Sequence, residues 1–216
     1  MYKFGQIEIE SKKFNSIYEV QRDIDLGRIR VSEGVVANKH DARFTIGYEV
    51  ESGKIIPLCI KTPKDCLSSG ISRFSEASPW KMGFNVSEDE AWVHQYEAIW
   101  WRINEFLHAP GCGGFELGGT LTGEPLSNGK YVNPKLIFWN GENRTRFREG
   151  EYARYIDEIP ACHATGVLKI GSVYRQGSNY HLQVFLKECK YRKRDVSFES
   201  QLSDDESDDS GCDTVH

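Results

Sequence analysis

Three stretches of the sequence combine basic with aromatic side chains. Proteins that bind single-stranded nucleic acid use this combination, because cations pair with phosphates and bases stack on aromatic rings at roughly 1–3 kcal/mol per base. The first stretch contains Lys61, Lys64, Arg73, Trp80 and Lys81. The second contains Trp139, Arg144, Arg146, Phe147 and Arg148, and the third contains Lys169, Tyr174, Arg175, Phe185, Lys187 and Lys190. Together the three favour a nucleic-acid-binding surface, although each alone is a weak signal.

The second stretch has the clearest pattern. Arg144, Arg146 and Arg148 alternate along the chain, so in a strand all three would lie on one face. A face of three arginines cannot belong to a core, which leaves a solvated surface or a phosphate-binding surface. The nearby Trp139 favours phosphate binding.

Residue types that could support catalysis or hold a metal occur, but not in a useful arrangement. Cys162 and His163 are neighbours, and adjacent side chains of a strand point to opposite faces. Residues 88–90 are all acidic, and their position at the start of a helix accounts for them through the helix dipole. The glycine-rich segment 111–124 lacks the Gly-Lys-Ser/Thr ending of a phosphate-binding loop and is expected to be a flexible loop. We expect no catalytic residue, no metal and no cofactor.

The cysteines and the hydropathy pattern indicate a compartment. None of the six cysteines forms a Cys-x-x-Cys pair, and no histidine lies at zinc-ligand spacing from such a pair. The first residues contain no apolar signal region, and no run of about 18 apolar residues could span a membrane. We expect reduced thiols, an intracellular protein and no membrane partner.

The end of the chain is strongly acidic. The whole chain carries a net charge of −5, but residues 201–216 contain six acids and no lysine or arginine, so residues 1–200 carry +1. The acids that we expect to contact partners are Asp204, Asp205, Glu206, Asp208 and Asp209. Residues 197–216 are too polar to bury apolar surface and are predicted to form a disordered tail after a single domain of residues 1–196.

Local patterns predict mainly β-structure with one long helix. Strands are expected at 43–50 and 54–61 around the turn 51–54, and at 80–86. Hairpins are expected at 135–149, with Asn140-Gly141 as the turn, and at 165–193, with the turn at 176–179.

The helix is expected to begin at a capping box formed by Ser87 and Glu90. Its apolar stripe, expected to pack on a sheet, is Trp92, Val93, Tyr96, Ile99, Trp100, Ile103, Phe106 and Leu107. Trp101 lies off this stripe, so we expect it to be partly exposed.

The order of several short motifs resembles a known family. An apolar strand leads into Lys61-Thr62-Pro63, followed by Gly70-Ile71, Lys81-Met82, Pro134-Lys135-Leu136 and the final hairpin. This order is similar to that of the OB-fold single-stranded-DNA-binding proteins of large nucleocytoplasmic DNA viruses.

The resemblance implies an OB-type β-barrel with a helix packed on it, and sequence-tolerant binding of single-stranded DNA, with RNA as an open alternative. It also implies a non-catalytic protein that coats DNA during viral replication, recombination or repair, in the host nucleus or at a cytoplasmic replication site. The acidic tail would then compete with DNA and recruit replication or recombination proteins.

A second hypothesis comes from a different class of protein. The chain could be a protein-interaction or chaperone-like β domain whose acidic tail binds basic proteins such as histones. The two hypotheses differ in what removal of the tail does to DNA affinity.

Overall fold

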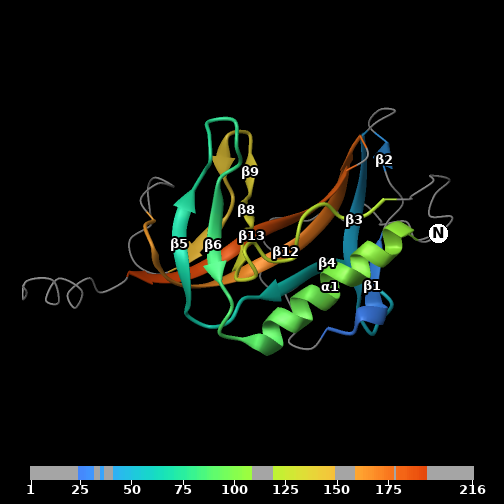
Figure 1. The fold of residues 1–216 in the computed structure, drawn as a ribbon, viewed down its shortest axis with the longest axis horizontal. Coiled ribbons are helices and arrows are strands. Elements are labelled where there is room, and N and C mark those ends of the chain that lie inside the picture. The colour runs from blue at the N-terminus through green and yellow to red at the C-terminus, as the bar shows by residue number, and fades with distance from the viewer. Residues whose placement is uncertain are drawn as a thin grey trace, which may run out of the picture.

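The computed structural model describes residues 24–31, 35–36, 41–108, 119–148, 159–177 and 179–193. This part of the chain consists mainly of strands, with one long helix, as the sequence predicts (Figure 1). The acidic tail lies outside the described residues, as do Cys112, Cys212 and most of the glycine-rich segment. No helix in the described part is both long and apolar enough to cross a membrane.

The elements follow one another in this order. They are η2 (Leu26–Arg28), β1 (Ile29–Val31), β2 (Val35–Val36), β3 (Asp41–Glu49), β4 (Ile55–Lys61), β5 (Cys66–Ser72), β6 (Lys81–Asn85), α1 (Glu90–His108), β7 (Tyr131–Val132), β8 (Lys135–Leu136), β9 (Phe138–Trp139), β10 (Glu142–Asn143), β11 (Arg146–Arg148), β12 (Cys162–Gln176) and β13 (Asn179–Lys193).

Five strands close into a barrel. β12 pairs with β5, β5 with β6, β6 with β8, β8 with β13, and β13 again with β12. All of these pairs are antiparallel except β8–β13, which is parallel. Counted along the chain, the barrel strands are β5, β6, β8, β12 and β13. The first (β5) therefore lies between the second (β6) and the fourth (β12), and the third (β8) lies between the second (β6) and the fifth (β13). This is the strand order of an OB-type barrel, and the predicted fold class is confirmed.

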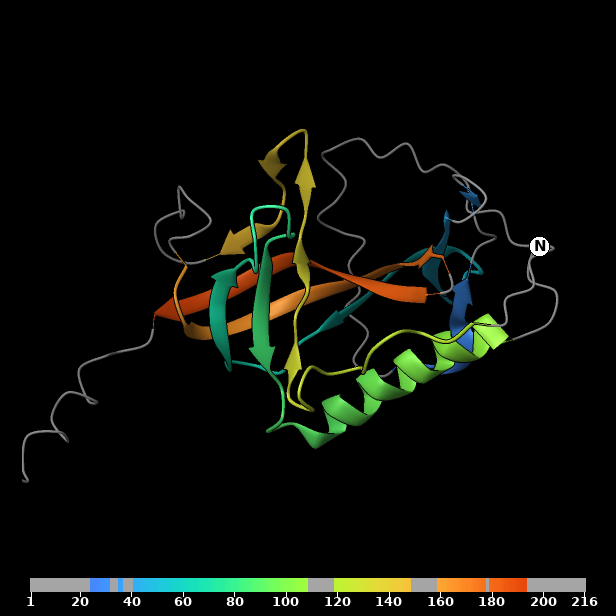
Figure 2. The same cartoon turned by 45° about the horizontal axis from the view of Figure 1, so that its top comes forward.

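The β12–β13 hairpin is longer than the barrel. The two strands have fifteen residues each and pair along their whole length, apart from two irregularities, one between Val167 and Leu168 and one between Ile170 and Ser172. The free edge of β12 pairs first with β5, then with β4, and finally with β3. The hairpin thus carries the barrel at one end and a smaller sheet of β1, β3 and β4 at the other (Figures 1 and 2).

The β3–β4 hairpin forms as predicted, with its turn at residues 51–54. Pro57 is exposed and is the last residue of β4 that pairs with β3, because the next residue, Leu58, pairs with β12. Proline has no backbone N–H to donate, and it is tolerated here because β4 changes its pairing partner from β3 to β12 at this point.

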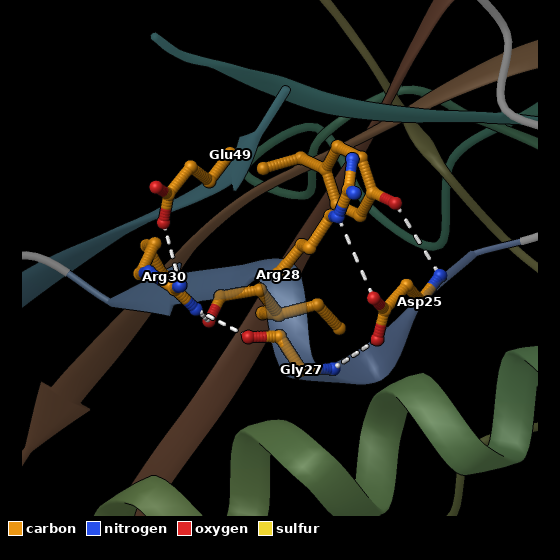
Figure 3. Close-up of polar contacts among 7 residues, drawn as sticks. Asp25, Gly27, Arg28, Arg30 and Glu49 are labelled. Carbon is orange, nitrogen blue, oxygen red and sulfur yellow. Dashed lines mark hydrogen bonds and ion pairs between the residues drawn. The ribbon is translucent and has the colours of Figure 1, made fainter. Parts of the chain in front are cut away.

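The segment before β3 is fixed to it by polar contacts (Figure 3). The Asp25 carboxylate accepts a hydrogen bond from the Gly27 N–H at 2.8 Å and pairs with Arg28 at 3.5 Å. Arg30 of β1 forms an ion pair with Glu49 of β3. The Asp25 N–H donates to the Tyr48 hydroxyl of β3 at 3.3 Å. This hydrogen bond and the Arg30–Glu49 pair hold the segment against the edge of β3, where β1 lies next to the C-terminal half of α1 (Figure 1).

The helix α1 buries six of the eight residues of the predicted apolar stripe, and Val93 and Phe106 are half-buried against the core. Trp101 is 55% exposed, as expected. The predicted capping box is wrong. The Asp89 carboxylate accepts a hydrogen bond from the Trp92 N–H at 2.9 Å, so Asp89 caps the helix. The Ser87 hydroxyl instead donates to the Asn85 side chain. Asp89 lies one residue before the first helical residue, where its side chain reaches the free N–H groups of the first turn.

The predicted hairpin at 135–149 is right at its tip and wrong at its ends. Asn140 and Gly141 both have positive φ and join β9 to β10 in a tight turn. The outer parts, β8 and β11, do not pair with each other, because both pair in parallel with β13. Residues 138–143 therefore project as a finger from a strand that otherwise runs along β13 (Figure 2).

Thr145 fixes the base of this finger. Its side chain is 6% exposed, and its hydroxyl accepts a hydrogen bond from the Ile137 N–H and donates one to the Leu186 carbonyl, both at 2.9 Å. The Arg144 N–H donates to the Ile137 carbonyl and closes the loop. One hydroxyl thus joins both sides of the finger to β13.

We predict that Thr145→Val lowers the free energy of unfolding by about 1–3 kcal/mol, because it leaves a buried N–H and a buried carbonyl without partners. Thr145→Ser keeps the hydroxyl and is the matched control, with a smaller loss. Chemical denaturation of the three proteins measures the difference, and equal losses for both variants would contradict this role of the hydroxyl.

Candidate nucleic-acid interface

Strand pairing aligns three lysines across the outside of the barrel. Lys169 of β12 pairs with Phe185 of β13, Phe185 pairs with Lys135 of β8, and Lys135 pairs with Lys81 of β6. Directly paired residues project from the same face of a sheet, and neighbouring strands lie about 4.8 Å apart. We call Lys81, Lys135 and Lys169, with Phe185 between the last two, the lysine row.

The lysine row faces outward because the residues beside it face inward. Leu168 and Ile170 flank Lys169, and Met82 and Leu136 follow the other two lysines; all four are buried in the core. Lys81 is exposed, whereas Lys135 and Lys169 are half-buried. The barrel therefore presents a band of positive charge that crosses the strands.

The charges of the lysine row are not neutralised within the described part of the chain, where none of the three lysines forms an ion pair. Burial lowers the pKa of Lys135, and the positive charge of Lys81 lowers it further. An anion placed between the two lysines would counteract this lowering of the pKa, because it favours the charged form of each lysine.

Lys187 adds a fourth cation beside the row. It lies at the irregularity where Val167 pairs with Glu188 and Leu168 pairs with Leu186, so Lys187 is an extra residue on β13. The pKa of Lys187 is lowered to about 8, mainly by burial. Cys59 raises this pKa by a smaller amount, and the positive charges of Lys169 and Arg146 lower it. The side chains of Lys169 and Arg146 therefore lie close enough to influence it.

Two projecting segments stand at one end of the lysine row. The β5–β6 loop begins after Ser72, which pairs with Lys81, and the finger of residues 138–143 begins just after β8. Both project from the same end of the barrel and lie side by side in Figures 1 and 2. Positively charged and aromatic groups thus meet at the base of these segments.

Exposed aromatic rings occupy the two segments. Phe74 in the β5–β6 loop is 99% exposed, and Trp139 and Phe138 in the finger are 67% and 37% exposed. Arg73 stacks over the ring of Trp80, with 4.6 Å between the guanidinium carbon and the ring centroid. Rings this accessible can serve as stacking platforms for bases.

The structure brings part of the predicted site together. Arg73, Trp80, Lys81 and Trp139 lie around the two projecting segments, and Arg146 and Lys187 lie beside the lysine row. The alternation in the second stretch is as expected, since Arg144, Arg146 and Arg148 are exposed, Thr145 is buried and Phe147 is half-buried against Tyr191. Arg144 pairs with Glu142 at 2.7 Å, however, and Arg148 pairs with Glu188 at 2.6 Å.

The remaining predicted residues lie away from the two projecting segments. Lys61 of β4 pairs with Val167 of β12, two residues from Lys169, so it lies beside the far end of the lysine row. Lys61 and Lys64 precede β5 and Arg73 follows it, so a strand about 20 Å long separates these lysines from Arg73. Tyr174 and Arg175 pair with β3 near the β12–β13 turn, beyond the barrel. Lys190 is exposed and pairs with Arg148 in the register of β11 and β13.

Three contributors were not singled out as site residues from the sequence. Phe74 is a single aromatic in a polar loop and Phe138 belongs to the apolar run 136–139, so only their exposure, which the sequence does not display, marks them. Lys135 enters the sequence prediction only as part of the Pro134-Lys135-Leu136 motif. What marks Lys135 as a site residue is its pairing with Lys81 of β6 and with Phe185 of β13. These strands are far apart in the chain, so the sequence does not show the pairing.

The described residues do not include a group of three or more His, Cys, Asp or Glu side chains that could hold a metal. Cys59, Cys66, Cys162 and Cys189 are free and buried, and burial raises the pKa of each thiol. His163 lies on the outer face, where its Nδ1 contacts the Asp65 carbonyl, while Cys162 faces the core.

Comparison of the chain with known protein-family models and with curated proteins found no match. The strand order therefore defines the class of fold, an OB-type barrel with a packed helix, and the resemblance to viral DNA-binding proteins stays a prediction.

We predict that Lys187→Met makes the protein more stable than wild type near pH 7, and that the difference shrinks as the pH rises. The pKa of Lys187 is about 8 in the folded protein and about 10.4 in the unfolded chain. Between these values the unfolded state binds more protons, so wild-type stability rises with pH. Unfolding free energies of both proteins at several pH values test this, and a pH-independent difference would contradict it.

Proposed function

We propose that the protein binds single-stranded DNA without catalysing a reaction on it. The observation that carries the proposal is the lysine row, which crosses the barrel next to two segments with exposed aromatic rings. The strand order supports the proposal, because oligonucleotides commonly bind across the face of the second and third strands of such a barrel, here β6 and β8.

In this proposal a DNA strand runs across the β-strands along the lysine row. Lys81 and Lys135 lie on adjacent strands, and Lys169 lies two strands beyond Lys135, about 10 Å away. Phosphates contact these lysines and Lys187, and bases stack on Trp139 and Phe74. Because every base has a ring face to stack, the binding tolerates any sequence.

The proposed role is to coat and protect single strands during replication, recombination or repair, at a viral replication site inside a host cell, with RNA as an alternative ligand. The acidic tail would compete with DNA for the lysine row, and its carboxylates would recruit replication or recombination proteins. The charge distribution supports this role, because the six tail acids oppose a body that carries +1.

The proposal is tested by fluorescence anisotropy of a labelled oligo-dT at several salt concentrations. Lys135→Ala and Lys169→Ala should each weaken binding and reduce the slope of log affinity against log salt by about 0.7, the value for one phosphate contact on a single strand. Trp139→Ala should weaken binding and leave the slope unchanged, since stacking releases no counterions.

Lys54→Ala is the matched control, because Lys54 is an exposed lysine in the β3–β4 turn. It should leave both affinity and slope unchanged. Absence of binding by the wild-type protein at low salt would exclude the proposed function.

Deletion of residues 199–216 tests the role of the tail. If the tail competes with DNA, the shortened protein should bind oligo-dT more tightly and associate faster, because a tethered polyanion no longer occupies the lysine row. Unchanged affinity, together with loss of binding to a basic protein such as a histone, would instead support the protein-interaction hypothesis.

A further inference from the structure

A cleft of about 210 Å³ opens where the barrel wall splits. β8 pairs with β13 only at Phe185 and Leu186, so residues 181–184 of β13 diverge from the β7–β8 segment. The helix residues Tyr96 and Trp100 line the inner side of the cleft, and the other lining residues are Lys81, Thr122, Glu124, Pro125, Ser127, Tyr131, Val132, Asn133, Lys135, His181, Leu182 and Val184.

The cleft has a positively charged rim and an aromatic wall. Lys81 and Lys135 lie side by side on its rim and form no ion pair within the described part of the chain. Tyr131 and His181 are half-buried rings in its wall. The exposed Glu124 is the one acidic group among the lining residues, so the rim has an excess of positive charge. One side suits an anion, and the other suits a flat ring.

The size of the cleft limits its ligand. Sites for drug-sized ligands usually measure roughly 300–1,000 Å³, and this cleft, at about 210 Å³, is smaller. It has room for one base with part of its sugar, but not for two stacked bases. A phosphate at the rim would lie between two lysines, in the position where their mutual repulsion is otherwise unrelieved.

We propose that this cleft binds one nucleotide, with its phosphate between Lys81 and Lys135 and its base inserted against Tyr131 and His181. The inference rests on the proposed function, because it places the nucleotide within a bound strand. That nucleotide leaves the stack, while its neighbours stack on the rings of the β5–β6 loop and the finger. The chemistry is that of any nucleoside monophosphate, whether free or part of a strand.

The experiment uses isothermal titration calorimetry on the full-length protein with dTMP, thymidine and inorganic phosphate as separate probes. We expect dTMP to bind more tightly than either thymidine or phosphate, because it alone fills both parts of the cleft. Saturating the protein with oligo-dT beforehand should remove the dTMP signal, since the strand occupies the same cleft.

Three variants localise the signal. Lys81→Ala/Lys135→Ala should weaken dTMP binding by about tenfold or more, the loss expected for a charged hydrogen bond. Asn133→Asp places a negative charge at the rim and should weaken it similarly, with no change of volume. Lys54→Ala should bind dTMP as wild type does.

Several outcomes overturn the inference. Phosphate that binds as tightly as dTMP would leave an anion site without a base pocket, and dTMP that still binds to the oligo-dT complex would exclude a strand subsite. If oligo-dT binds and dTMP does not, nucleotide binding in the cleft is excluded but the proposed DNA-binding function is not. Failure of both ligands to bind would remove the proposed function as well.

Discussion

The pairing of β12 with β13 is the interaction on which the rest of the structure depends. A strand has two hydrogen-bonding edges. β12 and β13 pair with each other through one edge of each strand along fifteen residues. The remaining edge of β12 holds β5, β4 and β3 in succession, and that of β13 holds β8 and β11. The irregularities in this ladder bend both strands, which lets one end curl into a barrel while the other remains part of a smaller sheet.

The candidate site is a consequence of that ladder. The lysine row exists because β12 sets the register of β13, β13 sets that of β8, and β8 sets that of β6; a shift by one residue on any strand would turn its side chain into the core. The core is filled, with residues such as Phe84 and Leu168 fully buried, so the barrel offers its outer surface to a ligand. A surface formed in this way suits a flexible polyanion, and the split beside β8 adds a place for a single group.

Local patterns predict local structure well in this chain. The Asn140-Gly141 turn, the long final hairpin and the apolar helix stripe are all found. The sequence pattern does not predict β5, because Ser68 and Gly70 occupy inward positions, where a strand usually shows large apolar residues. A side chain at Gly70 would approach the Ile159 carbonyl at 2.5 Å, so crowding requires a small residue there. The residues of the site were only partly predictable. Lys81 and Lys135, 54 positions apart, become neighbours, and Lys169, 34 positions after Lys135, joins their row through registers that the sequence does not display.

The central claim is that DNA crosses the barrel along the lysine row. A titration of ¹⁵N-labelled protein with oligo-dT, followed by the backbone amide signals, tests it most directly. The account predicts that the largest shifts occur in β6, β8, the β5–β6 loop, the finger at 138–143 and the middle of β12 and β13. Shifts confined to the β12–β13 turn and β3, or to the β4–β5 connection with Lys64, would contradict it.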